Sequence, residues 1–292
     1  MGEINVSNIL PDEKVKSLVQ SWLAEDTPNF DYGGLVVGHK METAELLIKS
    51  PGIVAGVPFF DAVFQQLGCE VKWLCKEGSK FEPCTRERIA TVTGPCKNIL
   101  LGERIALNCI SRASGVATIA RRYLEIVGKT DWKGKIAGTR KTTPGFRLVE
   151  KYSLLVAGAD THRYNLSSMV MLKDNHIWSS GSITKAVEAT KSVSGFSTKI
   201  EVECQSLEEG LEAARAGADV VMFDNFKPEN LMSAAKTLKS QFPYVVVEAS
   251  GGIDEENISS YCVQDVDVIS TSKLIQGYPA VDFSLKIIKK NS

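Results

Sequence analysis

The chain is poor in metal-binding side chains: it has three histidines among 292 residues, and none of its seven cysteines stands in a Cys-x-x-Cys pair. Structural zinc sites usually need such clusters, so we expect no zinc site. An odd number of scattered cysteines also argues against a disulfide framework and predicts reduced thiols. These cysteines are Cys69, Cys75, Cys84, Cys96, Cys109, Cys204 and Cys262.

The chain also lacks an excess of charge and any long apolar run. Lys and Arg total 34 against 35 Asp and Glu, which gives a net charge of −1 and speaks against a nucleic-acid partner. The longest apolar runs fall well below the ~20 residues of a membrane-spanning helix, so no membrane association is expected. The start of the chain has no basic region and no apolar core of a secretory signal. We therefore expect a cytoplasmic protein and leave a nuclear fraction open.

What the first third of the sequence does contain is a mixed pattern of helix and strand signals. It predicts a helix over residues 12–25 and strands around 33–38, 42–48, 69–75 and 89–94. A long amphipathic helix follows over residues 98–127, where apolar residues recur at helical spacing. We expect this helix to bridge the two halves of the chain.

From residue 135 onward, short apolar strands alternate with helical stretches. Strands are predicted at 135–138, 199–204, 219–223, 244–249 and 266–270, and helices at 206–216, 228–241 and 254–261. One strand–helix unit about every 20 residues implies a parallel sheet, and this many units favour a TIM-like α/β barrel, closed or incompletely closed. An open doubly wound sheet is the alternative, which the missing Gly-x-Gly-x-x-Gly disfavours.

The predicted fold class is therefore α/β, with two domains. Residues 1–115 form an N-terminal α+β sandwich, and residues 116–278 form the barrel. The tail at 281–288 alternates like a strand, so we expect residues 279–292 to return to the N-terminal domain.

A basic segment lies between residues 138 and 177. It contains Arg140, Lys141, Arg147, Lys151, His162, Arg163 and Lys173, with only three acidic residues among them. Any one such cation would normally be a solvated loop charge. Several of these cations, however, follow short apolar runs, so they would project together from strand ends. A pocket of this kind suits a ligand with several negative charges, because Arg recognises carboxylates and phosphates and Lys adds a point charge.

Two further features fit a phosphorylated ligand. Ser250-Gly251-Gly252 follows one strand and Ser270-Thr271-Ser272 the next, which is where barrels often bind phosphate, although Gly-Gly also serves an ordinary tight turn. Glu203 and Asp224 end neighbouring strands, and paired carboxylates beside phosphates commonly hold Mg²⁺, directly or through water. The alternative is that they only balance the cations.

These motifs strongly resemble the quinolinate phosphoribosyltransferases, the carboxylating nicotinate-nucleotide pyrophosphorylases, of the eukaryotic type. The resemblance covers most of the chain. Its matching segments are residues 103–108, 139–145, 162–163, 173–176, 201–203, 224–226 and 248–253.

The resemblance implies that quinolinate and phosphoribosyl pyrophosphate become nicotinate mononucleotide, pyrophosphate and CO₂ in NAD biosynthesis. It implies a homodimer with a shared active site and leaves further assembly to a hexamer open. The implied catalytic residues are Lys141, Lys173, Glu203 and Asp224, with Mg²⁺ near the two carboxylates. The implied substrate-binding residues are Arg104 of the partner subunit, Thr139, Arg140, Lys141, His162, Arg163, Lys173, Glu203, Asp224, Ser250, Gly251, Gly252 and Ser272.

Within this set, His162 is expected to be a fixed donor to a carboxylate, since the reaction needs no general base at the ring nitrogen. The other two histidines are given no substrate role: His176 is predicted to be structural and His39 a surface residue.

The sequence departs from the family pattern in the last barrel loop. Ser272 stands where a closely approaching Gly is common, and Gln276 where a His can contact phosphate; Lys273 is a possible replacement contact. The alternatives are a paralogous phosphoribosyltransferase for another aromatic acid, which would need fewer cations, and a non-catalytic anion-binding protein of the same fold. The presence of Lys173, Glu203 and Asp224 disfavours the second alternative.

Overall fold

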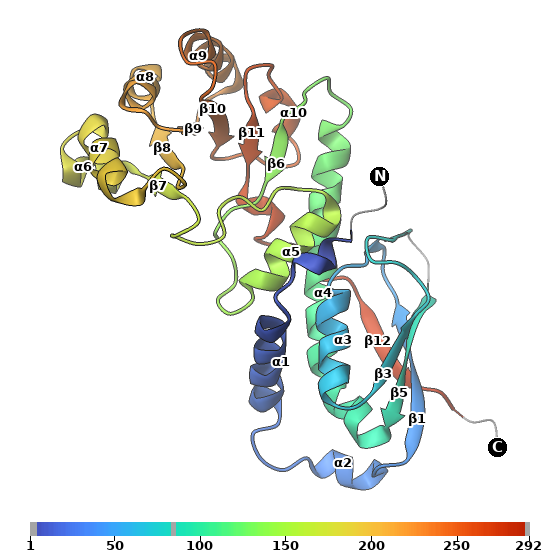
Figure 1. Cartoon of the computed structure of the whole chain (residues 1–292). Coiled ribbons are helices and arrows are strands. Elements are labelled where there is room, and N and C mark those ends of the chain that lie inside the picture. Colours follow the sequence, from blue (N-terminus) through green and yellow to red (C-terminus); the bar gives the residue numbers. More distant parts are fainter. Residues whose placement is uncertain (1–4, 83–85, 290–292) are drawn as a thin grey trace. The chain divides into compact units, whose positions relative to one another are not determined.

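The structure is a computed structural model that describes residues 5–82 and 86–289, so Cys84 lies outside the described part of the chain. The chain divides into two compact units (Figure 1). The first groups residues 1–121, 143–158 and 278–292, and the second groups residues 122–142 and 159–277. The six described cysteines are free thiols. Within the described ranges, no helix combines the length and apolar character needed to cross a bilayer.

The first unit is built on a four-stranded antiparallel sheet of order β12-β1-β5-β3. Its strands are β1 (Met41–Ile48), β3 (Glu70–Trp73), β5 (Glu87–Pro95) and β12 (Phe283–Ile287). The strand β12 near the end of the chain pairs with β1 in this sheet. A small second sheet pairs β2 (Gly52–Ile53) with β4 (Lys80–Phe81).

Helices complete the first unit. They include α1 (Asp12–Asp26), α3 (Val57–Gln66), α4 (Cys96–Val127) and α5 (Arg147–Ala157), and the short 3₁₀ helix η1 (Val6–Ile9) precedes α1. The helix α4 has 32 residues, and its last turns belong to the second unit. The helices α1 and α4 confirm the helices predicted over residues 12–25 and 98–127. The strand predicted around residues 33–38 is wrong: this segment is the helix α2 (Tyr32–Val37). The carboxylate of Asp31 accepts the Gly34 amide at 2.8 Å and so caps the helix start, a local signal that the apolar alternation concealed.

The second unit is a six-stranded, fully parallel sheet of order β6-β11-β10-β9-β8-β7. The strands are β6 (Lys135–Ala137), β7 (Val170–Leu172), β8 (Ile200–Cys204), β9 (Val220–Asp224), β10 (Val246–Ser250) and β11 (Val268–Ser270). The strands β6 and β7 form the two edges, so the described strands make an incompletely closed barrel. The prediction of a parallel α/β barrel that need not close is confirmed.

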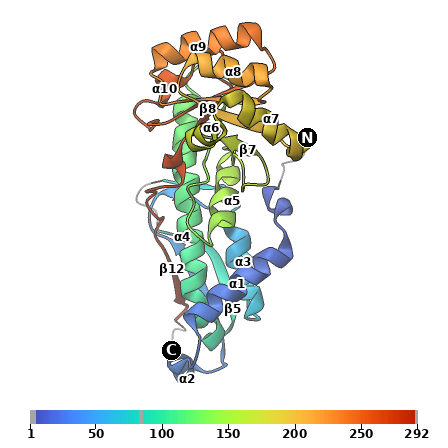
Figure 2. The ribbon, with the colours of Figure 1, turned by 90° about the vertical axis from the view of Figure 1, so that its left-hand side faces the viewer.

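The two faces of this sheet differ in polarity, because side chains alternate along a strand. One face carries apolar residues such as Val202, Val221 and Val247, which are fully buried beneath helices. These helices are α6 (Asp174–Ser180), α7 (Ile183–Ser194), α8 (Leu207–Ala216), α9 (Pro228–Gln241) and α10 (Ile258–Tyr261), of which α8, α9 and α10 lie together in Figure 2. The opposite face carries Glu201, Glu203 and other polar groups, and the candidate site is built on it.

The helix predicted over residues 254–261 is shorter than expected, since α10 begins only at Ile258. The preceding residues form turns in which Asp254 Oδ1 accepts the amides of Glu256 and Asn257 at 3.0 and 3.1 Å. Aspartate favours such local bonds, which compete with helix formation.

Candidate active site

Polar residues gather where the parallel strands of the second unit end. Because carboxyl ends of parallel strands meet at one edge of a sheet, residues from different strands become neighbours there. The predicted residues at this edge are Thr139 after β6, Lys173 after β7, Glu203 in β8, Asp224 at the end of β9, Ser250 at the end of β10, and Ser272, which begins the 3₁₀ helix η2 (Ser272–Leu274) after β11.

Lys173 and Glu203 are joined by an ion pair between Nζ and Oε2. On the next strand, Asp224 Oδ2 accepts from the side-chain amides of Asn225 at 2.5 Å and Gln205 at 3.4 Å. Glu203 lies opposite Met222 in the β8–β9 register, two residues before Asp224, so the two carboxylates project from the same face of the sheet. The two acids are therefore neighbours, as the strand pattern predicts.

The loop after β10 can be built only with glycine at position 251. Gly251 has φ +91°, and an added Cβ would lie 2.4 Å from Asn225 Oδ1 and 2.7 Å from the Asn225 nitrogen. Asn225 itself has a positive φ of 57°, and its amide donates to the Ser250 carbonyl at 2.9 Å. Asn225 therefore contacts the candidate phosphate loop on one side and the Asp224 carboxylate on the other.

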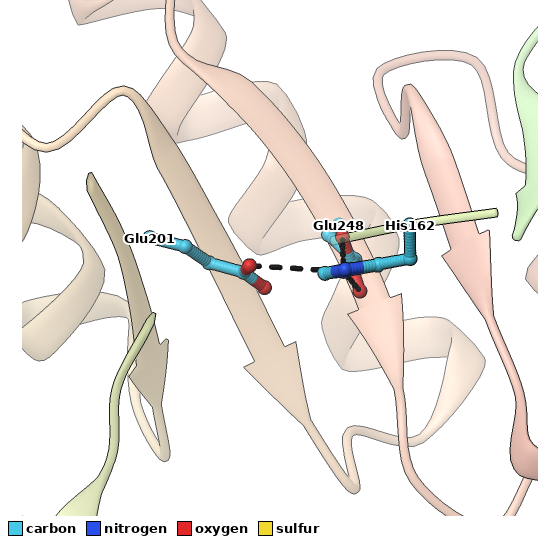
Figure 3. Close-up of side chains that lie close together, drawn as sticks. All are labelled: His162, Glu201 and Glu248. Carbon is cyan, nitrogen blue, oxygen red and sulfur yellow. Dashed lines mark hydrogen bonds and ion pairs between the residues drawn. The ribbon is translucent and has the colours of Figure 1, made fainter. Parts of the chain in front are cut away.

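Beneath this edge, two buried glutamates face one histidine ring (Figure 3). His162 Nε2 lies 3.1 Å from both carboxylate oxygens of Glu248 and 3.7 Å from Glu201 Oε2. Glu201 is completely buried, and neither of its oxygens has a hydrogen-bond partner among the described residues. Burial raises the pKa of the Glu201 carboxyl, and the neighbouring charge of Glu248 raises it further, while Arg163 and Lys173 oppose the shift.

The proton on the histidine ring can be assigned from its partners. The ring nitrogen Nδ1 accepts the Arg163 amide at 2.7 Å, so in the neutral ring the hydrogen sits on Nε2 and points at Glu248. The three side chains are spaced closely enough to hold a metal ion. In this tautomer, however, Nε2 offers no lone pair to a metal and instead donates its hydrogen to Glu248. The sequence prediction gave His162 a substrate carboxylate as its partner, whereas here Nε2 faces a carboxylate of the protein.

The predicted cations differ in exposure. Arg140 and Lys141 are exposed, and Arg163 and Lys173 are half-buried. Burial and the nearby charge of Arg140 both lower the pKa of Arg163, while the charge of Glu201 opposes the shift. Two guanidinium groups close to one another favour an anionic ligand.

Arg104 lies on α4, in the first unit, and is exposed. A cavity of about 1250 Å³ also belongs to the first unit, and none of the predicted site residues lines it. His176 Nδ1 accepts the Lys173 amide at 3.1 Å, as its predicted structural role requires, and His39 is exposed as expected.

The sequence pattern assigns no individual role to Glu201, Glu248 or Asn225, and it places Ser270 only in the candidate phosphate loop. A signal was available for the glutamates, since each stands two residues before a predicted site residue on the same strand and therefore projects from the same face. The positive φ of Asn225 has no comparable signal in the sequence.

Comparison with known proteins identifies the family. Residues 31–114 match the family described as quinolinate phosphoribosyl transferase, N-terminal domain, and residues 116–286 match its C-terminal domain. The chain belongs to the quinolinate phosphoribosyltransferase family.

Individual relatives extend over nearly the whole chain. The nicotinate-nucleotide pyrophosphorylase [carboxylating] of Rattus norvegicus is 53% identical over 96% of this chain and 93% of its own length, and the Homo sapiens protein of that name is 52% identical over 97% and 94%. Among solved structures, the nicotinate-nucleotide pyrophosphorylase from Francisella tularensis has a TM-score of 0.87 at 33% identity and covers 98% of this chain and 100% of its own.

Proposed function

We propose that the chain transfers the phosphoribosyl group of phosphoribosyl pyrophosphate to quinolinate and releases pyrophosphate and CO₂. The observation that carries this proposal is the edge of the parallel sheet, where cations for a dicarboxylate adjoin two carboxylates and a glycine loop suited to phosphate. The relatives named carboxylating nicotinate-nucleotide pyrophosphorylases support the same reaction.

The cations on this edge suit quinolinate, a pyridine with two adjacent carboxylates. Arg140 and Arg163 supply guanidinium groups that can pair with carboxylates in two-bond geometry. His162 holds the backbone of Arg163 through its ring. The partner subunit's Arg104 would complete the clamp in a homodimer, which can assemble further.

Phosphoribosyl pyrophosphate would lie across the remaining strand ends. Its 5′-phosphate fits the amides of Ser250, Gly251 and Gly252 and the loop at Ser272, with Thr139 nearby. Its pyrophosphate would meet Lys141 and Lys173, which stabilise the departing negative charge.

Glu203 and Asp224 fit Mg²⁺, because their carboxylate oxygens are the ligands this ion prefers and their side chains share one face. They would hold the ion directly or through water, and the ion would help to neutralise the leaving pyrophosphate. The chain's own part in the reaction is to orient the ring nitrogen of quinolinate toward the ribose carbon and to bind both anions. Once that nitrogen is positively charged, it stabilises the carbanion left by loss of CO₂. We also propose that this reaction takes place in the cytoplasm.

The test is to incubate the purified protein with quinolinate, phosphoribosyl pyrophosphate and Mg²⁺ and to measure CO₂ and pyrophosphate. We expect the two products to appear in equal amounts. Equal turnover of nicotinate, which has one carboxylate, would contradict the diacid assignment, and release of neither product would contradict the enzymatic function.

A further inference from the structure

We propose that Glu248 is a positioning residue that couples the loop carrying Arg163 to the loop carrying Ser250. The proposal rests on the proposed function, since it assigns quinolinate to the first loop and the phosphate of the co-substrate to the second. Glu248 stands on β10, one of the two central strands of the sheet, is 2% exposed, and accepts hydrogen bonds from both His162 and Ser270.

The first connection runs to the loop after residue 159. His162 has a φ of 55°, a left-handed conformation that a non-glycine residue adopts only when its surroundings hold it there. Asp160 Oδ1 accepts the His162 amide at 2.8 Å, and Glu248 accepts from Nε2 at 3.1 Å. The backbone and the ring of His162 are thus fixed at separate points.

That fixed ring determines the start of Arg163. The His162 Nδ1 atom accepts the Arg163 amide at 2.7 Å, so the direction in which the ring points also sets the direction of the next peptide. The guanidinium of Arg163 then bonds the Met169 carbonyl at 3.4 Å. Since the ring is held at its other nitrogen by Glu248, the carboxylate acts on Arg163 through His162.

The second connection runs to the phosphate loop. The hydroxyl of Ser270, 1% exposed, donates to Glu248 Oε1 at 2.5 Å and thereby uses its single proton. The Ser250 hydroxyl donates to the Ser270 carbonyl at 3.3 Å, and its oxygen lies 3.1 Å from Ser270 Oγ. The orientation of the first residue of the loop therefore depends on a serine that Glu248 holds.

Two variants separate these connections. A glutamine at position 248 can keep an oxygen at the Oε1 position, which faces both Ser270 and His162, but it loses the charge and places an NH₂ group at the Oε2 position, 3.1 Å from His162 Nε2. Two donors then oppose each other at the histidine ring, and the bond to Ser270 becomes a neutral one. We expect Glu248→Gln to raise KM for both substrates by about ten-fold or more, the order expected for loss of a charge-assisted hydrogen bond. Ser270→Ala removes only the second connection, so we expect KM for phosphoribosyl pyrophosphate to rise about five-fold while KM for quinolinate stays unchanged.

Matched controls come from the first unit. Glu150 is equally buried and accepts from Thr143, and Ser153 is a buried serine that donates to the Val149 carbonyl. The variants Glu150→Gln and Ser153→Ala should leave the ratio of the two KM values at the wild-type level. If Glu248→Gln fails to fold, Ser270→Ala still decides: equal KM values in this variant and the wild type overturn the proposal.

A second readout does not depend on turnover. With only three histidines, the ring nitrogens can be assigned by ¹⁵N NMR with the help of His39→Gln and His176→Gln variants. We expect His162 to carry its proton on Nε2 with a downfield, slowly exchanging signal that changes in Glu248→Gln and persists in Ser270→Ala. An unchanged His162 signal in Glu248→Gln overturns the proposal, whereas a protein that shows the signal but does not turn over quinolinate contradicts the proposed function instead.

Discussion

Lys173 directly follows strand β7, Glu203 stands on the neighbouring parallel strand β8, and their side chains form an ion pair. The lysine side chain is 45% exposed and the glutamate 12% exposed, so the pair reaches from the sheet toward solvent. The proposed polyanionic substrate needs a cation, which Lys173 supplies. Its proposed metal ion needs an oxygen ligand, which Glu203 supplies. Neutralising Glu203 therefore removes a candidate metal ligand and releases the lysine as well.

The double variant Glu203→Gln, Asp224→Asn should lose most of the rate together with its dependence on Mg²⁺. Both candidate ligands become neutral amides, which bind Mg²⁺ far more weakly than carboxylates. The measurement is turnover across a Mg²⁺ titration, with Glu208→Gln, an exposed glutamate on α8, as the control. A fast double variant that still responds to Mg²⁺ would mean that the two carboxylates serve only as counter-ions.

Removing either arginine should abolish quinolinate turnover and leave phosphoribosyl pyrophosphate binding measurable. The variants Arg140→Ala and Arg163→Ala each lose a charge-assisted contact with a carboxylate, worth ~1.5–3 kcal/mol. Turnover and calorimetric binding of each substrate would be compared with Arg122→Ala, which removes an arginine paired with Glu255 outside the site. Loss of binding of both substrates would instead indicate a general disruption of the sheet edge.

Most of the fold could be predicted because its signals are local. The parallel strands β8 to β11 are short apolar runs between helical stretches. In α4, apolar residues recur at helical spacing over a long stretch of sequence. The errors occurred where a single capping bond decides the structure, as at Asp31 before α2, or where a turn replaces a helix start, as at Asp254. Such bonds leave hydrophobic periodicity unchanged, so the pattern cannot reveal them.

In the candidate site, too, local sequence signals predict some residues and miss others. Residues at strand ends, such as Lys173 and Asp224, follow from their position after apolar runs. The partners of His162 do not, because Glu201 and Glu248 lie 39 and 86 residues from it in the sequence. The strand register brings both glutamates to the ring of His162. The sequence does not contain this register, so it cannot show which of several acidic residues becomes buried there.

A stability prediction concerns the first unit, away from the site. Burial raises the pKa of Asp61 to about 6, with Glu77 adding to the shift and the Trp73 indole opposing it. The folded protein thus binds the proton more tightly than the unfolded chain, whose ordinary value is 3.8. The charged carboxylate therefore destabilises the fold above about pH 6, by ~3 kcal/mol, and this penalty fades as pH falls toward 4.

The variant Asp61→Asn should raise the free energy of unfolding at pH 7.5 by ~1–3 kcal/mol, since asparagine keeps an acceptor for the Trp73 indole, now at 2.8 Å. Urea unfolding at pH 7.5 and at about pH 4.5 checks this, with the exposed Asp26→Asn as control. The gain should shrink at the lower pH. An equal gain at both pH values would show that the charge of Asp61 is not its cause.

The phosphate loop offers a paired glycine test. Both Gly251 and Gly252 have positive φ, but only at Gly251 would a Cβ meet other atoms, whereas nothing lies within 4 Å of one at Gly252. Gly251→Ala should therefore weaken phosphoribosyl pyrophosphate binding more than Gly252→Ala, which bears only the backbone strain of ~1–2 kcal/mol. Calorimetric binding measures both, and equal losses would mean that the contact with Asn225 does not shape the loop.

The proposed shared site predicts complementation between two inactive proteins. A subunit with Arg104→Ala keeps an intact barrel unit but cannot serve its partner, while a subunit with Lys173→Ala has a defective barrel unit but still donates Arg104. After subunit exchange, half of the dimers in a random mixture contain one of each, and one of their two sites is whole. The mixture should therefore recover about a quarter of wild-type activity, because a two-fold interface presents the same surface from both subunits. Two preparations of Lys173→Ala alone, exchanged in the same way, serve as the control and should stay inactive. If the mixed sample also stays inactive although labelled subunits have exchanged, Arg104 acts within its own subunit or takes no part in the reaction.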